Sequence, residues 1–266
     1  MDPGEEGVKK LFVIAKKEFA ALFHSWVGVV TGVLFFLMTG IFFLVLVLTY
    51  NKLSMDPRAF GLSSLANINQ TQYIFGSFFL NASFILNFLV PILTMRVFAE
   101  EKKQETLELL FTYPVSDFEI VGGKLLGLVG FFMTLLLPIT GYFLIFHLIG
   151  GEIDWGPALS GLFGFWLLGI SYLTAGLFIS TLTRSPVMSA LGTFGLLVLF
   201  WMLEIIKTTG QGLGLVVLEA LSPLSHYRNF TYGILDLRDL VYFGFFFAYF
   251  LFLALRSIET RNWKNV

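Results

Sequence analysis

The sequence contains no cysteine, and this absence excludes disulfide bonds, thiolate metal sites and a thiol nucleophile. Charged residues are scarce as well: Asp, Glu, Lys and Arg make up 13% of the 266 residues, whereas a soluble domain has about 25%. The net charge is −1, and no block of basic residues offers a track for nucleic-acid phosphates. The composition therefore gives no support to thiol chemistry or to binding of nucleic acid.

Several catalytic sequence patterns are also missing. No H-E-x-x-H or G-x-S-x-G occurs, so a zinc protease and a serine hydrolase have no support. The nearest approach to the phosphate-binding pattern G-x-x-x-x-G-K-[ST] is GGKL at 122–125, which lacks its spacing and its hydroxyl. His147, Glu152 and Asp154 lack the tight spacing of a metal site, so we interpret them as loop residues. We expect no catalytic residue, metal site or cofactor in this chain.

Apolar residues dominate what is present. Hydrophobic residues make up 56% of the chain, and the mean hydropathy is +0.81. They form runs of about 20 residues, the length that crosses the hydrocarbon core of a membrane. The sequence therefore predicts an all-α integral membrane protein, a single domain over 1–266 with six transmembrane helices. The expected spans are 27–49, 73–97, 121–149, 157–182, 187–206 and 240–256.

Lysines and arginines are divided unevenly between the two sides of the membrane that these spans define. Of the 17, we count 12 on the side of both termini and 5 on the other side. The positive-inside rule therefore places both termini in the cytoplasm. The outer loop 207–239 contains the apolar stretch 213–221, which is too short to cross and is expected to form a short external re-entrant helix.

The segment 1–25 precedes the first span and is amphipathic. Lys9, Lys10, Lys16 and Lys17 flank its apolar face, which predicts a helix lying along the cytoplasmic membrane surface. The apolar face comprises Val8, Leu11, Phe12, Ala15, Phe19, Leu22 and Phe23. The alternative is a lead-in to the first span without a role of its own.

The segment 98–120 joins the second and third spans and is charged, although a short loop would connect them. Thr106 can cap a new helix, Pro114 ends it, and Ser116 with Glu119 forms a capping box that starts the third span. Leu107, Leu110 and Phe111 share one face of that helix, and Glu108 faces away. A rigid surface helix tied to two spans suits contact with a soluble partner. The alternative is a surface helix that only closes the loop.

Residues 96–124 resemble the ABC-2 type of ABC transporter permeases, which carry an Arg–Glu-Glu–Thr-x-Glu–Leu-Leu–Pro-Val-Ser–Lys pattern between the second and third spans. The matching residues are Arg96, Glu100, Glu101, Thr106, Glu108, Leu109, Leu110, Pro114, Val115, Ser116 and Lys124. The family commonly has glycine where this chain has Glu105, which we expect to lengthen the preceding helix slightly. The segments 221–243 and 256–264 are similar to a bacterial subgroup that includes gliding-motility and nitrous-oxide-reductase-maturation permeases.

This resemblance implies a type V exporter fold in the inner membrane of a bacterium. Two six-span subunits, a homodimer or a pair of paralogues, would each sit on an ABC ATPase that holds ATP and Mg, and an accessory or periplasmic protein could join them. The segment 98–120 would be the cytoplasmic coupling helix, and the turn at 183–186 would be a second contact. The interface residues implied are Glu100, Glu101, Thr106, Leu107, Glu108, Leu110, Phe111, Pro114, Ser116 and Arg184.

Three polar residues within the spans are candidates for a conduit. Glu204 is a carboxylate inside an apolar run, which marks a functional candidate, although Lys207 lies one turn further on and could pair with it. Asn81 and Asn87 could line a path or make hydrogen bonds between helices. The leading prediction is a non-enzymatic permease subunit for ATP-driven export. The alternatives are a mechanotransmitter that drives an outer partner without moving cargo and, with no supporting motif, a membrane-embedded enzyme.

Overall fold

The computed structural model describes residues 3–55, 71–106, 115–209 and 219–262, and the account below concerns these residues. They form helices and turns, with no strand among them. In chain order the elements are α1 (Pro3–His24), α2 (Trp26–Met55), the π-helix η1 (Gln72–Gly76), α3 (Ser77–Thr94), α4 (Ala99–Lys103), α6 (Asp117–Leu148), α7 (Trp155–Leu182), α8 (Pro186–Thr209), α10 (Pro223–Thr231) and α11 (Leu237–Asn262).

Among the residues that the structure describes, six segments are helical, long and apolar enough to cross a membrane, which confirms the predicted number of transmembrane helices. The second candidate span includes η1, α3 and α4, and the sixth lies within α11. The candidate spans are Trp26–Leu53, Gln72–Lys103, Asp117–Leu148, Trp155–Leu182, Pro186–Ile206 and Leu237–Thr260. An all-α membrane protein is therefore the correct fold class.

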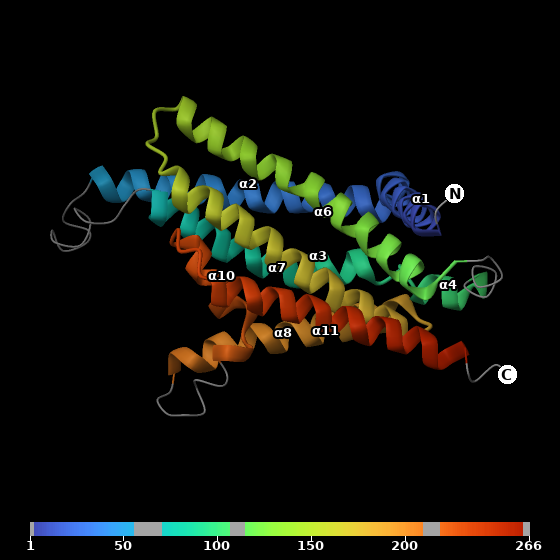
Figure 1. Cartoon of the computed structure of the whole chain (residues 1–266). Coiled ribbons are helices and arrows are strands. Elements are labelled where there is room, and N and C mark those ends of the chain that lie inside the picture. The colour runs from blue at the N-terminus through green and yellow to red at the C-terminus, as the bar shows by residue number, and fades with distance from the viewer. Residues whose placement is uncertain (1–2, 56–70, 107–114, 210–218, 263–266) are drawn as a thin grey trace.

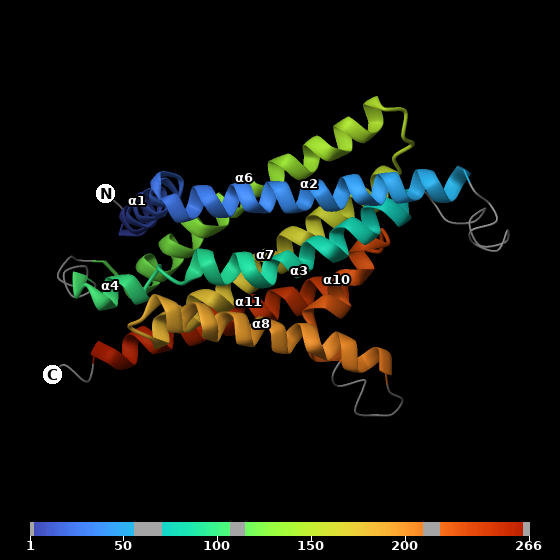
Figure 2. The ribbon, with the colours of Figure 1, turned by 180° about the vertical axis from the view of Figure 1, so that it is seen from behind.

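The long helices run lengthwise through the molecule, and both termini lie at one end together with α4 (Figure 1). The view from behind shows the same arrangement, with α10 toward the opposite end (Figure 2). An even number of crossings returns the chain to its starting side, so the position of the termini agrees with six spans.

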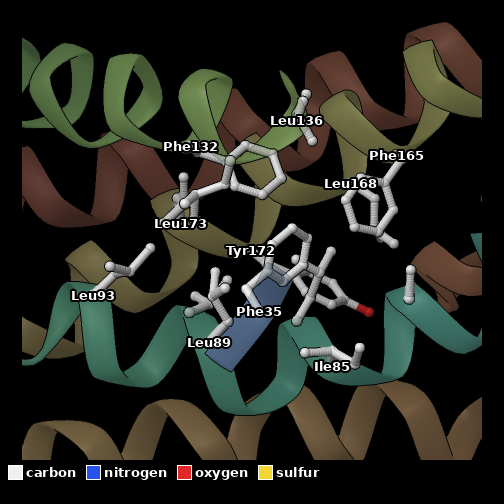
Figure 3. Packing of buried hydrophobic residues seen from close by; sticks show 14 of the residues in the cluster. Phe35, Ile85, Leu89, Leu93, Phe132, Leu136, Phe165, Leu168, Tyr172 and Leu173 are labelled. Atoms are coloured by element: carbon white, nitrogen blue, oxygen red, sulfur yellow. The ribbon is translucent and has the colours of Figure 1, made fainter. Parts of the chain in front are cut away.

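The helices α3 and α7 form the centre of the bundle. About two thirds of the most apolar window of the α3 span and of the α7 span is buried, against 22% for α2, α8 and α11. Figure 3 shows Leu89 of α3, Phe132 of α6 and Tyr172 of α7 turned toward one another in this core. The exposed apolar side chains on the peripheral helices are suited to contact with lipid.

Small residues allow α7 to approach its neighbours closely. A Cβ added to Gly161 would lie 2.6 Å from the ring of Phe79, and one added to Gly169 would overlap the ring of Phe132. The hydroxyl of Ser160 donates a hydrogen bond to the carbonyl of Phe230 at 2.7 Å. Such small-residue contacts are typical of helix packing in membranes, and here they join helices within one chain.

The helix α1 runs across the long helices and packs against α6 (Figure 1). Gly123 and Gly127 of α6 lie one turn apart. A Cβ added to Gly123 would lie 2.8 Å from the side chain of Ile14, and one added to Gly127 would lie 2.8 Å from the carbonyl oxygen of Ala15. These two glycines thus let the backbone of α1 approach α6 closely. Phe12 on another face of α1 stays 62% exposed. This docking supports a role for α1 beyond that of a lead-in to the first span.

Candidate functional site

The turn between α3 and α4 is held by the end of α7. The backbone amides of Phe98 and Ala99 donate to the hydroxyl of Ser180 at 3.1 and 3.2 Å. The first amides of a helix lack intrahelical partners, so Ser180 caps α4 from another helix. The buried ammonium of Lys102 donates to the carbonyl of Thr181, where the partial negative charge at the end of α7 favours a cation. The helix α4 is therefore fixed to α7 at both of its ends.

A buried cation lies beside this turn. Lys124 of α6 is 1% exposed, and its ammonium contacts Glu18 of α1 at 2.8 Å and Glu101 of α4 at 2.7 Å. It also donates to the carbonyl of Val97 at 3.0 Å and lies 5.1 Å from the ring centroid of Phe98. We call these residues the Lys124 cluster. It joins three segments that are far apart in the sequence: α1, the α3–α4 turn and α6.

The charges of the Lys124 cluster explain why these segments hold together. An ammonium removed from water is tolerated only when nearby carboxylates and hydrogen bonds replace its hydration. Lys124 has three such oxygen partners, one for each N–H that it can donate. Displacement of α4 or α1 from α6 would separate Lys124 from one of its carboxylate partners and leave buried charges unpaired. The three segments are therefore expected to move as one body.

The residues predicted to contact an ATPase, apart from Thr106, divide into three groups. Glu100 and Arg184 are on the surface at the end of the molecule that carries α4. Glu101 turns inward to Lys124, and Ser116 forms the capping box with Glu119, in which the two backbone–side-chain bonds measure 2.7 and 3.3 Å. Outside the described residues lie Leu107, Glu108, Leu110, Phe111 and Pro114.

Thr106 and Glu105 follow α4. The hydroxyl of Thr106 donates back to the carbonyl of Glu101 at 3.3 Å, and the helix that it was expected to cap lies outside the described residues. The expectation that Glu105 lengthens the preceding helix is wrong, because α4 ends at Lys103. Glu105 has φ of 57°, in the left-handed region that glycine adopts most readily. This explains why a glycine suits the position.

A groove of about 400 Å³ opens at the opposite end of the bundle, between α2, α3, α8 and α10. Asn81 and Glu204, two of the predicted conduit residues, lie in its wall beside Arg228. The remaining lining residues are Phe42, Leu80, Phe84, Trp201, Ile205 and Leu224. The third conduit candidate, Asn87, is buried elsewhere on α3 and donates to the carbonyl of Phe84 at 3.1 Å. The structure thus brings two of the three together.

The partner of Glu204 differs from the one that the sequence suggested. Its carboxylate is buried, lies 2.8 Å from the guanidinium of Arg228, and accepts a hydrogen bond from the hydroxyl of Ser225. Glu204 thus pairs with Arg228 of α10, whereas the side chain of Lys207 lies outside the described part of the structure. Sequence spacing favours partners within one helix, whereas the folded chain brings a second helix, α10, onto the C-terminal part of α8.

The helix α10 was expected only as part of an outer loop. Asp239 of α11 accepts hydrogen bonds from His226 at 2.6 Å and from Asn229 at 2.8 Å, and the His226 ring stacks on Tyr242 with centroids 4.0 Å apart. Burial raises the pKa of the neighbouring Tyr227 hydroxyl well above its ordinary value, so it stays neutral. These contacts fix α10 to α11.

A sequence signal for α10 was available. The side chain of Ser222 accepts a bond from the amide of Ser225, and Pro223 occupies the first turn. A serine cap followed by proline is a common helix start. This helix start was missed because the whole segment 207–239 was interpreted as one outer loop.

Of the three residues considered for a metal site in the sequence, His147 lies in the last turn of α6 and Asp154 has a structural role. Asp154 caps α7 by accepting from the amide of Gly156 at 3.2 Å, and its own amide donates to Thr71 at 2.8 Å. In the part of the chain that the structure describes, no group of three His, Asp or Glu residues could hold a metal ion.

Comparison with known proteins places this architecture in a family. The model of the ABC-2 family transporter proteins matches residues 12–259 and so includes α4, the Lys124 cluster and the groove between α2, α3, α8 and α10. A search of curated proteins gives no match. Since the family model matches nearly the whole chain, this protein belongs to the ABC-2 family of transporter proteins and is a membrane permease component of an ABC transporter.

Proposed function

We propose that this chain is the membrane subunit that couples ATP hydrolysis by a separate ABC ATPase to export. The observation that carries the proposal is the Lys124 cluster, which ties the segment after the second span to α1 and to α6. A partner that pushes on this segment would move α1 and α6 with it, because separating them would leave buried charges unpaired.

The contacts with α7 extend this path to the centre of the bundle. Ser180 and the carbonyl of Thr181 hold α4 at the end of α7. The helix α7 in turn packs against α3, α10 and α11, and α10 borders the outer groove. Displacement of α4 would thereby reach the groove, which we propose as part of the conduit, with Asn81 and Glu204 in its wall.

The proposed assembly has two permease copies, or one copy with a paralogue, each on an ATPase that holds ATP and Mg. We place the protein in the cytoplasmic membrane, with both termini and α4 on the cytoplasmic side, on the distribution of lysine and arginine. The absence of cysteine allows a direct test with single introduced thiols. In intact cells, a membrane-impermeant maleimide should label Ile234→Cys and should leave Gln104→Cys unlabelled. The opposite pattern would overturn the orientation and the docking proposal with it.

Export itself is tested by reconstitution with the ABC ATPase that co-purifies with the chain. We expect Arg184→Glu to reduce co-purification of the ATPase, whereas Arg256→Glu, a charge reversal on an exposed arginine of α11, should not. ATP-dependent movement of a tracer across the vesicle would support export. ATP hydrolysis that an outer protein stimulates, without movement of any tracer, would indicate the mechanotransmitter. Equal co-purification of both variants and wild type would contradict the proposed contact.

A further inference from the structure

A crevice of about 310 Å³ lies between α1, the α3–α4 turn and α6, beside the Lys124 cluster. The lining residues are Lys17, Glu18, Ala21, Leu22, Ser25, Leu93, Arg96, Val97, Glu100, Glu101, Gln104 and Leu128. One part of this wall is apolar and the other carries charges of both signs. Such a combination suits a ligand with an apolar body and a polar head.

The crevice lies at the level where the chain enters the membrane. Ser25, in its wall, directly precedes the first span, which begins at Trp26. Along the second span, the wall changes from Leu93 to the charged pair Glu100 and Arg96 near the end of that span. An apolar-to-charged gradient at this level matches the boundary between lipid chains and headgroups.

The crevice wall carries two cations, Lys17 and Arg96, and three carboxylates, Glu18, Glu100 and Glu101, and these charges are not all paired. Lys17 forms no ion pair with any described part of the chain. One carboxylate oxygen of Glu101 contacts Lys124, and the other is buried without a hydrogen-bond partner. Arg96 and Glu100 lie 3.6 Å apart on the half-exposed rim, where such a pair contributes little by itself. The crevice therefore places cationic donors and carboxylate acceptors side by side.

We propose that this crevice binds the ethanolamine headgroup of a phospholipid from the leaflet next to α1. The lipid phosphate would accept from Lys17 and Arg96, and the primary ammonium would donate to the carboxylate of Glu100. The apolar end of the wall would cover the start of the acyl chains. A choline headgroup has the same charges but no N–H to donate, and a glycerol headgroup has no cation to place against the carboxylates. The proposal concerns a bound lipid and is independent of export.

The test uses the full-length protein in nanodiscs that contain equal amounts of phosphatidylethanolamine, phosphatidylcholine and phosphatidylglycerol. After extraction into detergent, native mass spectrometry counts the lipids that remain bound to the protein. We expect phosphatidylethanolamine to be retained over phosphatidylcholine by about fivefold, the ratio that one additional hydrogen bond gives. Lys17→Gln and Glu100→Gln should each lower this ratio toward one.

Two matched variants serve as controls. Lys16→Gln removes the neighbouring exposed lysine, which does not line the crevice, and Glu105→Gln does the same for a carboxylate near Glu100. Both should keep the selectivity of the wild type. Because Lys17 is exposed and unpaired, its substitution leaves the fold intact, and thermal unfolding verifies this. Equal retention of the three lipids, preference for phosphatidylglycerol, or unchanged selectivity in Lys17→Gln and Glu100→Gln would overturn the proposal.

Discussion

Replacement of Lys124 by methionine tests the Lys124 cluster most directly. Methionine fills a similar volume but removes the charge, so Glu18 and Glu101, whose side chains are 18% and 24% exposed, lose their shared cation. Removing one partner of a buried ion pair costs about 3 to 5 kcal/mol, because the other charge stays buried and unpaired. Replacing all members by neutral residues of similar shape is often neutral or stabilising. We therefore expect Lys124→Met to lose about 3 to 5 kcal/mol, and the triple variant with Glu18→Gln and Glu101→Gln to recover most of it.

Unfolding by a denaturing detergent, monitored by circular dichroism, measures these free energies. The same variants, reconstituted with the ATPase, separate stability from mechanics. If the charges transmit displacement, the triple variant should be stable and yet fail to convert ATP hydrolysis into export. A loss below about 1 kcal/mol in Lys124→Met, the range of a surface ion pair, would refute the reasoning. Full export by the triple variant would refute the mechanical role while leaving the structural one.

Three further substitutions have definite expected results. Glu105→Gly should stabilise the chain by about 0.5 to 1 kcal/mol in the same unfolding assay. Glycine relieves the left-handed backbone strain of about 1 to 2 kcal/mol, and the greater flexibility of the unfolded chain offsets part of that gain. A lower stability would show that Glu105 is not strained. Gly169→Ala should lower the free energy of unfolding by about 1 to 3 kcal/mol, since its Cβ would overlap the Phe132 ring. Gly244→Ala should not destabilise the protein, because its Cβ would have no neighbour within 4 Å. Equal thermal stability of the two variants would contradict the packing of α7 on Phe132. Arg228→Gln should lower the free energy of unfolding by about 2 kcal/mol, because it leaves Glu204 without its cation. Addition of Glu204→Gln should restore the midpoint of thermal unfolding. Failure of that rescue would mean that Arg228 stabilises the protein through packing.

The sequence predicted the parts of the fold that depend on local pattern. Apolar runs located all six spans, because the length of a span follows from the thickness of the membrane. The capping box at Ser116 and Glu119 was readable because both of its hydrogen bonds join residues three positions apart. Asn81 and Glu204 were selected as polar residues in apolar runs, and both line the outer groove.

The contacts that build the candidate site depend on neighbours that are distant in the sequence. In the sequence Lys124 is only the last residue of the family pattern, at the start of the third span, whereas in the folded chain it is buried and paired with residues of α1 and α4. Glu101 was assigned to a contact with an ATPase because the family resemblance implied it, but its carboxylate turns inward to Lys124. Glu204 pairs with Arg228 of α10, a helix that was not predicted within the loop 207–239. No local periodicity specifies which helices meet, so these pairings required the folded chain.

The Lys124 cluster has a consequence for the order in which the protein is made. Glu18 leaves the ribosome first, and its ammonium partner follows 106 residues later, a delay of about 5 to 20 s at ordinary translation rates. During that interval α1 has neither the glycine surface of α6 nor the cation that balances its carboxylate. The newly made helix must wait at the lipid surface or with an insertion factor until the third span arrives. Folding of this protein thus includes a late step in which α1 packs onto α6 and Glu18 pairs with Lys124.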